Sequence, residues 1–270
     1  MSIVFACATS HTPGIRAWPD APPADIKERF FGGLERLGDQ LNAARPDAIL
    51  IISSEHFANY FLDGMPAFTI GQGETHFGPV EPWLKIPQGH TLGEPELASR
   101  LLSAAFGAGF ELNYSHELKL DHGTMVPLSF LDPERALPVV PLIVNAMTFP
   151  MPQPARCYSL GQILGAALEA DASRVAVVAT GGLSHAPGER MHGDIDTEFD
   201  ADFLRRLTAG DGDALISYTD DEMTSRGLGT HEIRTWITLA GICSGRSADV
   251  LYYEPVPAWA TGCSLLSYSV

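Results

Sequence analysis

Three short runs of apolar residues along the chain are each followed, after a few small polar residues, by a histidine. Runs of this length that are rich in β-branched residues and end near Gly, Ser or Pro predict buried strands. In open α/β sheets, ligands bind outside the carboxyl ends of the strands. The pattern therefore predicts a shared site of the metal-binding kind, built from three distant segments: residues 3–8 followed by His11, 49–52 followed by His56, and 175–179 followed by His185.

Between these strands, apolar residues recur at three- and four-residue spacing, which predicts helices that pack one face against a sheet. The strand–helix–strand order favours parallel βαβ units. We expect helices at residues 25–44, 95–106, 156–170 and 196–215, and an amphipathic helix marked by Ile233, Trp236, Ile237 and Ala240. Further strands are expected at residues 139–144, 249–254 and 261–268.

Residues 64–93 are rich in Gly and Pro and show little periodicity, which predicts a long loop with short hairpins. Its residues Phe68, Phe77, Trp83 and Leu84 are expected to be buried. Because the chain shows no repeat and no break in composition, we expect one domain over residues 1–270. The predicted fold class is α/β, with a single three-layer α/β/α domain around a mostly parallel or mixed central sheet.

Composition and charge narrow the classes of function. The 270 residues include 33 acidic and 17 basic side chains, which gives a formal net charge of −16. That charge repels phosphate backbones, and no cluster of Lys or Arg reverses it locally, so nucleic acid is not an expected partner. An anionic substrate would need a locally positive site, such as a metal ion.

The cysteines and the apolar runs indicate the compartment. The four cysteines are isolated and lack the spacing of a metal or redox motif, which indicates a reduced, cytoplasmic protein. The first apolar stretch is short and follows no basic region, so it is not expected to be a signal peptide. No run approaches the roughly 20 apolar residues that span a bilayer, so no membrane partner is expected.

The nine histidines differ in their surroundings. A buried structural histidine is the ordinary explanation for any one of them, but three at one sheet edge favour a shared site. His122 lies in a polar segment, Asp121-His122-Gly123-Thr124, that precedes an apolar run. The histidines that lie in polar loops are expected to be solvent-exposed: His76, His90, His116 and His192.

Two neutral imidazoles and one carboxylate, with other positions open, form the common non-haem iron(II) site. Zinc hydrolases use the same ligand types, so the residues alone leave both metals open. Glu55 directly precedes His56, and adjacent strand residues point to opposite faces, which argues against both being ligands. Glu232 could instead interact with a helix N-terminus. The spacing does not decide among the candidates Glu55, Asp121 and Glu232, or the rival ligand His231.

Six segments, in order and over nearly the whole chain, resemble the class II extradiol ring-cleavage dioxygenases. This is the family of the protocatechuate 4,5-dioxygenase catalytic subunit and 2,3-dihydroxyphenylpropionate 1,2-dioxygenase. Each segment is a weak motif by itself, whereas six in series are a strong signal. They are SHTP (10–13), EHFANYF (55–61), LDHG (120–123), GGLSH (181–185), GTHEIRTW (229–236) and YYEPVP (252–257).

The resemblance implies a ligand set and a reaction. It implies that His11, His56 and Glu232 bind iron(II), that His185 is the acid/base residue and that His122 assists at the substrate. The implied enzyme is an extradiol dioxygenase that inserts both atoms of O2 into the ring of a catechol-type compound, next to its hydroxyls. The resemblance gives His231 no metal role and leaves Glu55 outside the ligand set.

The resemblance also bears on partners. Some relatives cover the site with a small helical lid subunit or a fused helical region, so either another chain or loops such as residues 64–93 would cover it here. A homo-oligomer is expected, and the substrate could be gallate, protocatechuate, a catechol propionate or an aminophenol. The competing interpretations are a zinc-dependent hydrolase and a non-catalytic binding protein on the same fold. Proton-transfer histidines such as His122 and His185 argue against the latter.

Overall fold

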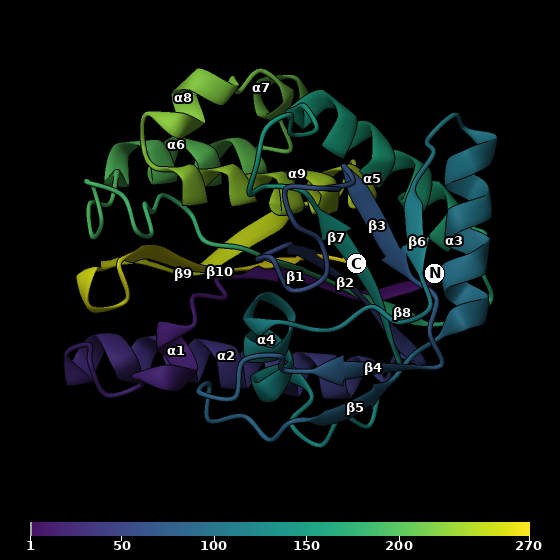
Figure 1. Cartoon of the computed structure of the whole chain (residues 1–270), viewed down its shortest axis with the longest axis horizontal. Coiled ribbons are helices and arrows are strands. Elements are labelled where there is room, and N and C mark those ends of the chain that lie inside the picture. The colour runs from purple at the N-terminus through teal and green to yellow at the C-terminus, as the bar shows by residue number, and fades with distance from the viewer. Residues whose placement is uncertain (1) are drawn as a thin grey trace.

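The computed structural model describes residues 2–270 and shows a central sheet with helices on both faces (Figure 1). In the described residues the sheet has eight strands, in the order β6-β3-β7-β2-β8-β1-β10-β9, and β4 and β5 form a separate two-stranded sheet. The strands are β1 (Ile3–Thr9), β2 (Ala48–Ser54), β3 (Phe68–Gly71), β4 (Thr75–Gly78), β5 (Gly89–Leu92), β6 (Asn113–Ser115), β7 (Val139–Val144), β8 (Val175–Thr180), β9 (Ala248–Val256) and β10 (Thr261–Tyr268).

The sheet is mixed, with a parallel centre. β7, β2, β8 and β1 run parallel to one another, whereas β3 and β10 pair antiparallel to the outer members of this group. β8 lies between the other two strands that are followed by histidines, with Thr180 opposite Thr9 and Ala179 opposite Ile52. The predicted fold class is confirmed, and the three strands end at one edge of the sheet.

Helices cover both faces of the sheet. α1, α2 and α4 lie on one side together with the β4–β5 hairpin, and α5 to α9 lie on the other (Figure 1). Among residues 2–270, no helix combines the length and the apolar character that crossing a membrane requires. The helices are α1 (Gly14–Ala17), α2 (Ala24–Ala44), α3 (Pro95–Gly107), α4 (His122–Leu131), α5 (Pro154–Glu169), α6 (Thr197–Thr208), α7 (Gly212–Ile216), α8 (Asp220–Thr224) and α9 (Ile233–Ile242), with 3-10 turns η1 (Leu228–Glu232) and η2 (Pro257–Trp259).

The central strands are apolar throughout because each contributes side chains to two hydrophobic cores. In β2, Leu50 and Ile52 join the core beneath α5 and α9, whereas Ile49 and Ile51 join the core beneath α2 and α4. Alternate side chains of a strand point to opposite faces, so a strand covered on both faces needs a continuous apolar run. This explains why these strands were recognisable from the sequence.

Two predicted helices differ from the observed ones. Residues 196–215 form two helices, α6 and α7, because Gly210 adopts a φ of 63° and Asp211 caps the second helix by accepting a hydrogen bond from the amide of Ala214. α9 was expected to be amphipathic, yet every one of its residues is buried. The polar residues of α9 include Thr235 and Thr238. The Thr235 hydroxyl lies 2.7 Å from the carbonyl oxygen of Thr180 in β8 and 2.8 Å from that of Glu232, and the Thr238 hydroxyl donates to the carbonyl of Arg234 in the same helix.

The loop at residues 64–93 also contains more structure than expected. β3 lies between β6 and β7 in the main sheet and buries Phe68. Leu84 is buried as predicted, but Phe77 and Trp83 stay 37% and 50% exposed. The expectation that His76 is exposed was wrong. His76 is 1% exposed and its Nδ1 donates to the carbonyl of Leu118 at 2.9 Å.

The helices α5 and α9 pack with their backbones in close contact. A Cβ added at Gly161 would lie 2.1 Å from the carbonyl oxygen of Thr238, and one added at Gly241 would lie 2.2 Å from that of Tyr158. Atoms cannot approach so closely, so glycine is required at both positions. This contact positions the N-terminus of α9, where Glu232 lies.

We therefore expect Gly161→Ala to lower the free energy of unfolding by about 2 kcal/mol or more, because the new methyl group would push α9 away from α5. The matched control is Gly32→Ala in α2, where a Cβ would meet nothing within 4 Å. Alanine should stabilise that helix by about 0.5–1 kcal/mol. Urea unfolding followed by circular dichroism measures both effects. Unchanged stability of Gly161→Ala would contradict the close packing of the two helices.

Candidate metal centre and active site

The sheet edge brings together His11, His56 and Glu232. His11 and His56 follow β1 and β2, and Glu232 ends η1 and caps α9. The Nε2 atoms of His11 and His56 lie 3.1 Å and 2.9 Å from the same Glu232 oxygen, Oε1. Three side chains from distant parts of the chain thus direct their donor atoms toward one point.

Hydrogen bonds behind the two rings determine which nitrogen faces Glu232 with a lone pair. The Thr180 hydroxyl donates to the carbonyl of Gly123, so it must accept a hydrogen bond from Nδ1 of His11, 3.0 Å away. Nδ1 of His56 donates to Asp121 Oδ2 at 2.9 Å. With the proton on Nδ1, each ring presents the lone pair of Nε2 as a metal ligand would.

The charges around Glu232 keep it ionised. Burial would raise the pKa of Glu232, but His11, His185 and His56 outweigh burial and hold this pKa well below its ordinary value. Its Oε2 also accepts a hydrogen bond from the amide of Gly182, and Ser54 donates to Oε1. Glu232 is therefore an anionic carboxylate that accepts hydrogen bonds at both oxygens.

Burial acts on the partners of Glu232 as well. It lowers the pKa of His11, against the attraction of Glu232. Burial would also lower the pKa of His56, but Asp121 and Glu232 outweigh it and raise this pKa well above its ordinary value. Burial would raise the pKa of Asp121, yet His56 and the neighbouring histidines hold it at about 2. Two buried carboxylates thus face a cluster of imidazoles, an arrangement that a divalent cation would stabilise.

His122 lies beside the two proposed ligands. It is the first residue of α4, and its ring packs against that of His56 with the centroids 4.1 Å apart. Its Nδ1 donates to Glu81 Oε1 at 2.7 Å, and its backbone amide donates to the same oxygen at 3.1 Å. The ring nitrogens of His11, His56 and His122 approach within 4.8 Å of one another, so the geometry also allows His122 as a donor to a metal.

His185 lies on the other side of Glu232. Its Nδ1 donates to the carbonyl of Leu183 at 2.9 Å, and its Nε2 is 3.7 Å from Glu232 Oε2. The ring occupies space that two glycines leave open, because a Cβ on Gly229 would lie 2.2 Å from its Nε2 and a Cβ on Gly182 would lie 2.6 Å from its Cε1. His185 thus has a defined orientation, next to Glu232 but beyond hydrogen-bond distance from it.

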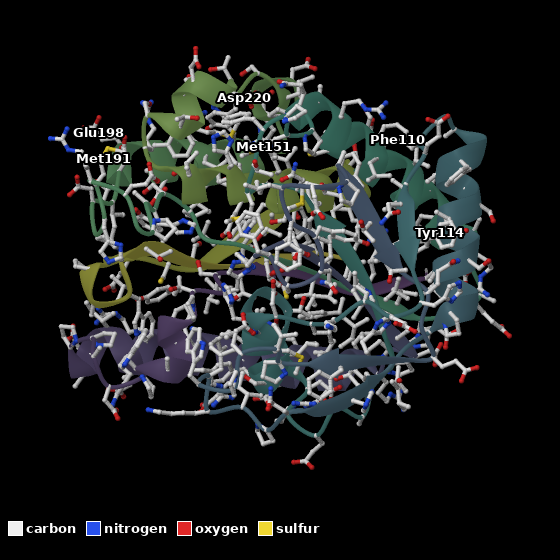
Figure 2. The ribbon with its side chains drawn as sticks, in the orientation of Figure 1. Phe110, Tyr114, Met151, Met191, Glu198 and Asp220 are labelled. Carbon is white, nitrogen blue, oxygen red and sulfur yellow. The ribbon has the colours of Figure 1, made fainter. Side chains whose placement is uncertain are left out.

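The rival ligands lie elsewhere. Glu55 accepts hydrogen bonds from the amides of Ala58 and Asn59 and so stabilises the turn after β2. His231 points away from Glu232, with its Nδ1 2.6 Å from the guanidinium of Arg234, and burial lowers its pKa to about 4. Arg234 is fully buried and pairs with Asp220 of α8. Figure 2 shows Asp220 in the outer helical layer.

Sequence reasoning missed several residues that orient the histidines. Thr180, Asp121 and Glu81 each bond to the Nδ1 of a histidine, although Asp121 had been considered as a ligand. Asp200 accepts hydrogen bonds from the amide and hydroxyl of Ser184 and thereby holds the loop of His185. The capping position of Asp121 before α4 was the one available signal, since the other contacts join segments remote in the chain.

A cavity of about 470 Å³ opens beside these groups, a volume typical of small-molecule sites. The five side chains His11, His56, His122, His185 and Glu232 line it at one end. Two imidazole nitrogens and one carboxylate oxygen, converging with open space beside them, match the facial ligand set of non-haem iron(II). The residues therefore fit a divalent metal of the type that the resemblance implies.

Comparisons with known proteins agree with this geometry. The 2,3-dihydroxyphenylpropionate/2,3-dihydroxicinnamic acid 1,2-dioxygenase of Photorhabdus laumondii is 27% identical, over 99% of this chain and 97% of the relative. The enzyme of the same name from Xanthobacter autotrophicus is 28% identical, over 99% of each chain. The crystal structure of an uncharacterized Escherichia coli K12 protein superposes with a TM-score of 0.67 over 97% of this chain and 99% of the other, at 18% identity, and so supports the fold.

A family model connects these likenesses. The model described as the catalytic LigB subunit of aromatic ring-opening dioxygenase matches residues 5–264, which span all the strands of the central sheet except the ends of β1 and β10. The match includes every residue of the candidate site. The chain therefore belongs to the LigB family of aromatic ring-opening dioxygenases and is a ring-cleaving oxidoreductase.

Proposed function

We propose that the protein is a non-haem iron(II)-dependent extradiol dioxygenase that acts on a catechol-type compound. Both atoms of O2 enter the product, and the ring bond that breaks lies next to the hydroxyl-bearing carbons. Residues 1–270 form one catalytic domain in this proposal. The observation that carries it is the convergence of His11, His56 and Glu232 beside a cavity that His122 and His185 also line. Relatives named for a dihydroxyphenyl substrate support the catechol class.

The three proposed ligands hold the metal and leave one side of it open to the cavity. A bound iron(II) ion would supply the redox chemistry that joins a catechol to O2. The hydrogen bonds from His11 to Thr180 and from His56 to Asp121 keep both Nε2 lone pairs directed at the metal position. The carboxylate of Glu232 contributes the negative charge.

His185 moves protons in this proposal. Its Nδ1 proton is engaged by the carbonyl of Leu183, so Nε2 is the atom that accepts a proton from a catechol hydroxyl and returns it later. Gly182 and Gly229 leave room for the ring in this position, since a Cβ on either residue would clash with it. His122 hydrogen-bonds the substrate from the opposite side, and Glu81 holds its ring in place.

The proposal is tested by loading the protein with iron(II) in the absence of air and adding a panel of catechols. We expect uptake of O2 together with a yellow ring-opened product. His56→Ala should lose both metal and activity, since it removes one of two imidazole ligands. The control is His116→Ala, which alters an exposed histidine. No uptake with any catechol, or activity restored by zinc instead of iron, would count against the proposal.

His185→Gln separates proton transfer from metal binding. Because His185 is outside the proposed ligand set, the variant should bind iron(II) with wild-type stoichiometry. Its kcat should fall by about 10²–10⁴-fold, the usual contribution of a general acid/base. Metal analysis and O2 uptake on the same sample measure the two properties. Wild-type kcat, or loss of the metal, would remove His185 from this role.

Asp121→Asn tests the hydrogen bond behind His56. Asparagine caps a helix as well as aspartate does, so α4 should keep its start and the melting temperature should change little. The loss of the charge behind the ring should weaken iron(II) binding by about 10–100-fold. Asp211→Asn, at the equivalent cap of α7, is the matched control remote from the site. Equal metal affinity of the two variants would show that Asp121 acts only as a cap.

A further inference from the structure

The cavity wall beyond the proposed metal ligands is apolar. Its side chains there include Trp18, Met147, Pro187, Leu228 and Trp259. Trp18 is 60% exposed and stacks on Trp83, with ring centroids 6.3 Å apart, so the apolar surface continues outward from the cavity. A substituent on the ring of a bound catechol would lie against this wall.

The hydroxyl groups of the wall already have partners. Thr12 and Thr261 both line the cavity, and their hydroxyls donate to the carbonyl of Trp259 at 3.3 Å and 2.9 Å. His192 lines the cavity at its exposed margin. The hydroxyl protons of the wall are thus not directed at a ligand.

The charges near the wall are unfavourable to an anion. Among the described residues that line the cavity, none is Lys or Arg. Arg16, near Gly14 of the wall, donates instead to Ser129 at 2.7 Å, with its guanidinium over the ring of Phe130. Behind Leu228, the carboxylate of Glu189 accepts a hydrogen bond from the Leu228 amide at 2.7 Å.

We infer that the substrate is a catechol whose ring substituent is neutral and apolar, such as an alkyl or aryl group. This inference rests on the proposed function and specifies its substrate class. A carboxylate against this wall would lose its hydration without gaining a cation, which is costly. The propionate of the compound for which the relatives are named carries such a charge, so the specificity of this chain differs from that name.

Two pairs of compounds, matched in shape, test the inference. One pair is 3-isopentylcatechol and 2,3-dihydroxyphenylpropionate, and the other is 4-isopropylcatechol and protocatechuate. In each pair a branched alkyl end replaces a carboxylate of the same shape. With the iron-loaded protein we expect kcat/KM to be about 100-fold or more higher for the neutral member of at least one pair.

Binding measured without turnover gives a second readout. In the absence of O2, quenching of tryptophan fluorescence should report each compound, because Trp18 and Trp259 lie on the wall. The dissociation constants should show the same order as kcat/KM. Agreement of the two readouts would assign the preference to the wall rather than to the chemical steps.

Leu228→Arg introduces the missing cation at a side chain that is 39% exposed and so can accept it without disturbing the core. It should raise kcat/KM for the carboxylate members by about 10-fold and lower it for the neutral ones. Leu228→Gln, polar but uncharged, is the matched control and should not favour the carboxylates. Arg190→Gln checks that the nearby exposed arginine, which lies outside the wall, does not bind the carboxylate.

The outcomes separate the two proposals. If the protein oxidises neither these four compounds nor any other catechol, the proposed function is overturned. Turnover in which the carboxylate members equal or exceed the neutral ones would overturn the substrate inference alone. Loss of carboxylate turnover in Arg190→Gln would likewise overturn it, because a cation would then serve the site.

Discussion

The candidate site depends on the parallel pairing of β8 with β1 on one side and β2 on the other. Thr180 lies opposite Thr9, and Ala179 lies opposite Ile52, so the three strands end almost level. A slip of one residue in either pairing would turn every side chain of a strand to the opposite face. Both faces are covered by helices, but only one register also places Thr180 behind His11. Packing of the core and orientation of the site are therefore set by the same hydrogen bonds.

Glu232 comes from a helix instead of a strand end, and a different constraint places it at the sheet edge. It lies at the start of α9, a helix buried on all sides because α5 packs against its outer face at Gly161 and Gly241. Burial of a carboxylate is costly unless it is paired and hydrogen-bonded. Glu232 meets that requirement with Gly182, Ser54 and the surrounding imidazoles. The close approach of two backbones thus places a charge where it can be neutralised.

Sequence patterns predicted the parallel strands β7, β2, β8 and β1 because strands covered on both faces must be apolar throughout, whereas the short strands β3 and β6 were not predicted. The same patterns could not show that α9 is buried, since Thr235 and Thr238 are polar residues. Their hydroxyls are satisfied by backbone carbonyls, which for Thr235 include that of Thr180 in β8. His76 was misjudged for a related reason, because its partner, the carbonyl of Leu118, is remote in the chain. The positions of three histidines after apolar runs predicted a shared site, whereas the choice of Glu232 among the carboxylates came from the family resemblance alone.

Four of the histidines that line the cavity, His11, His56, His122 and His185, have the same orientation and differ in their distance from Glu232. In each ring Nδ1 donates outward, to Thr180, Asp121, Glu81 or the carbonyl of Leu183, so every Nε2 is turned inward. The rings of His11 and His56 come within hydrogen-bond distance of Oε1 and share one point with it. His185 stops 3.7 Å from the other oxygen, and His122 contacts the rings of the proposed ligands instead. The backbone positions that hold the rings thus divide chemically identical side chains into two proposed ligands and two rings to which we assign proton transfer and substrate binding.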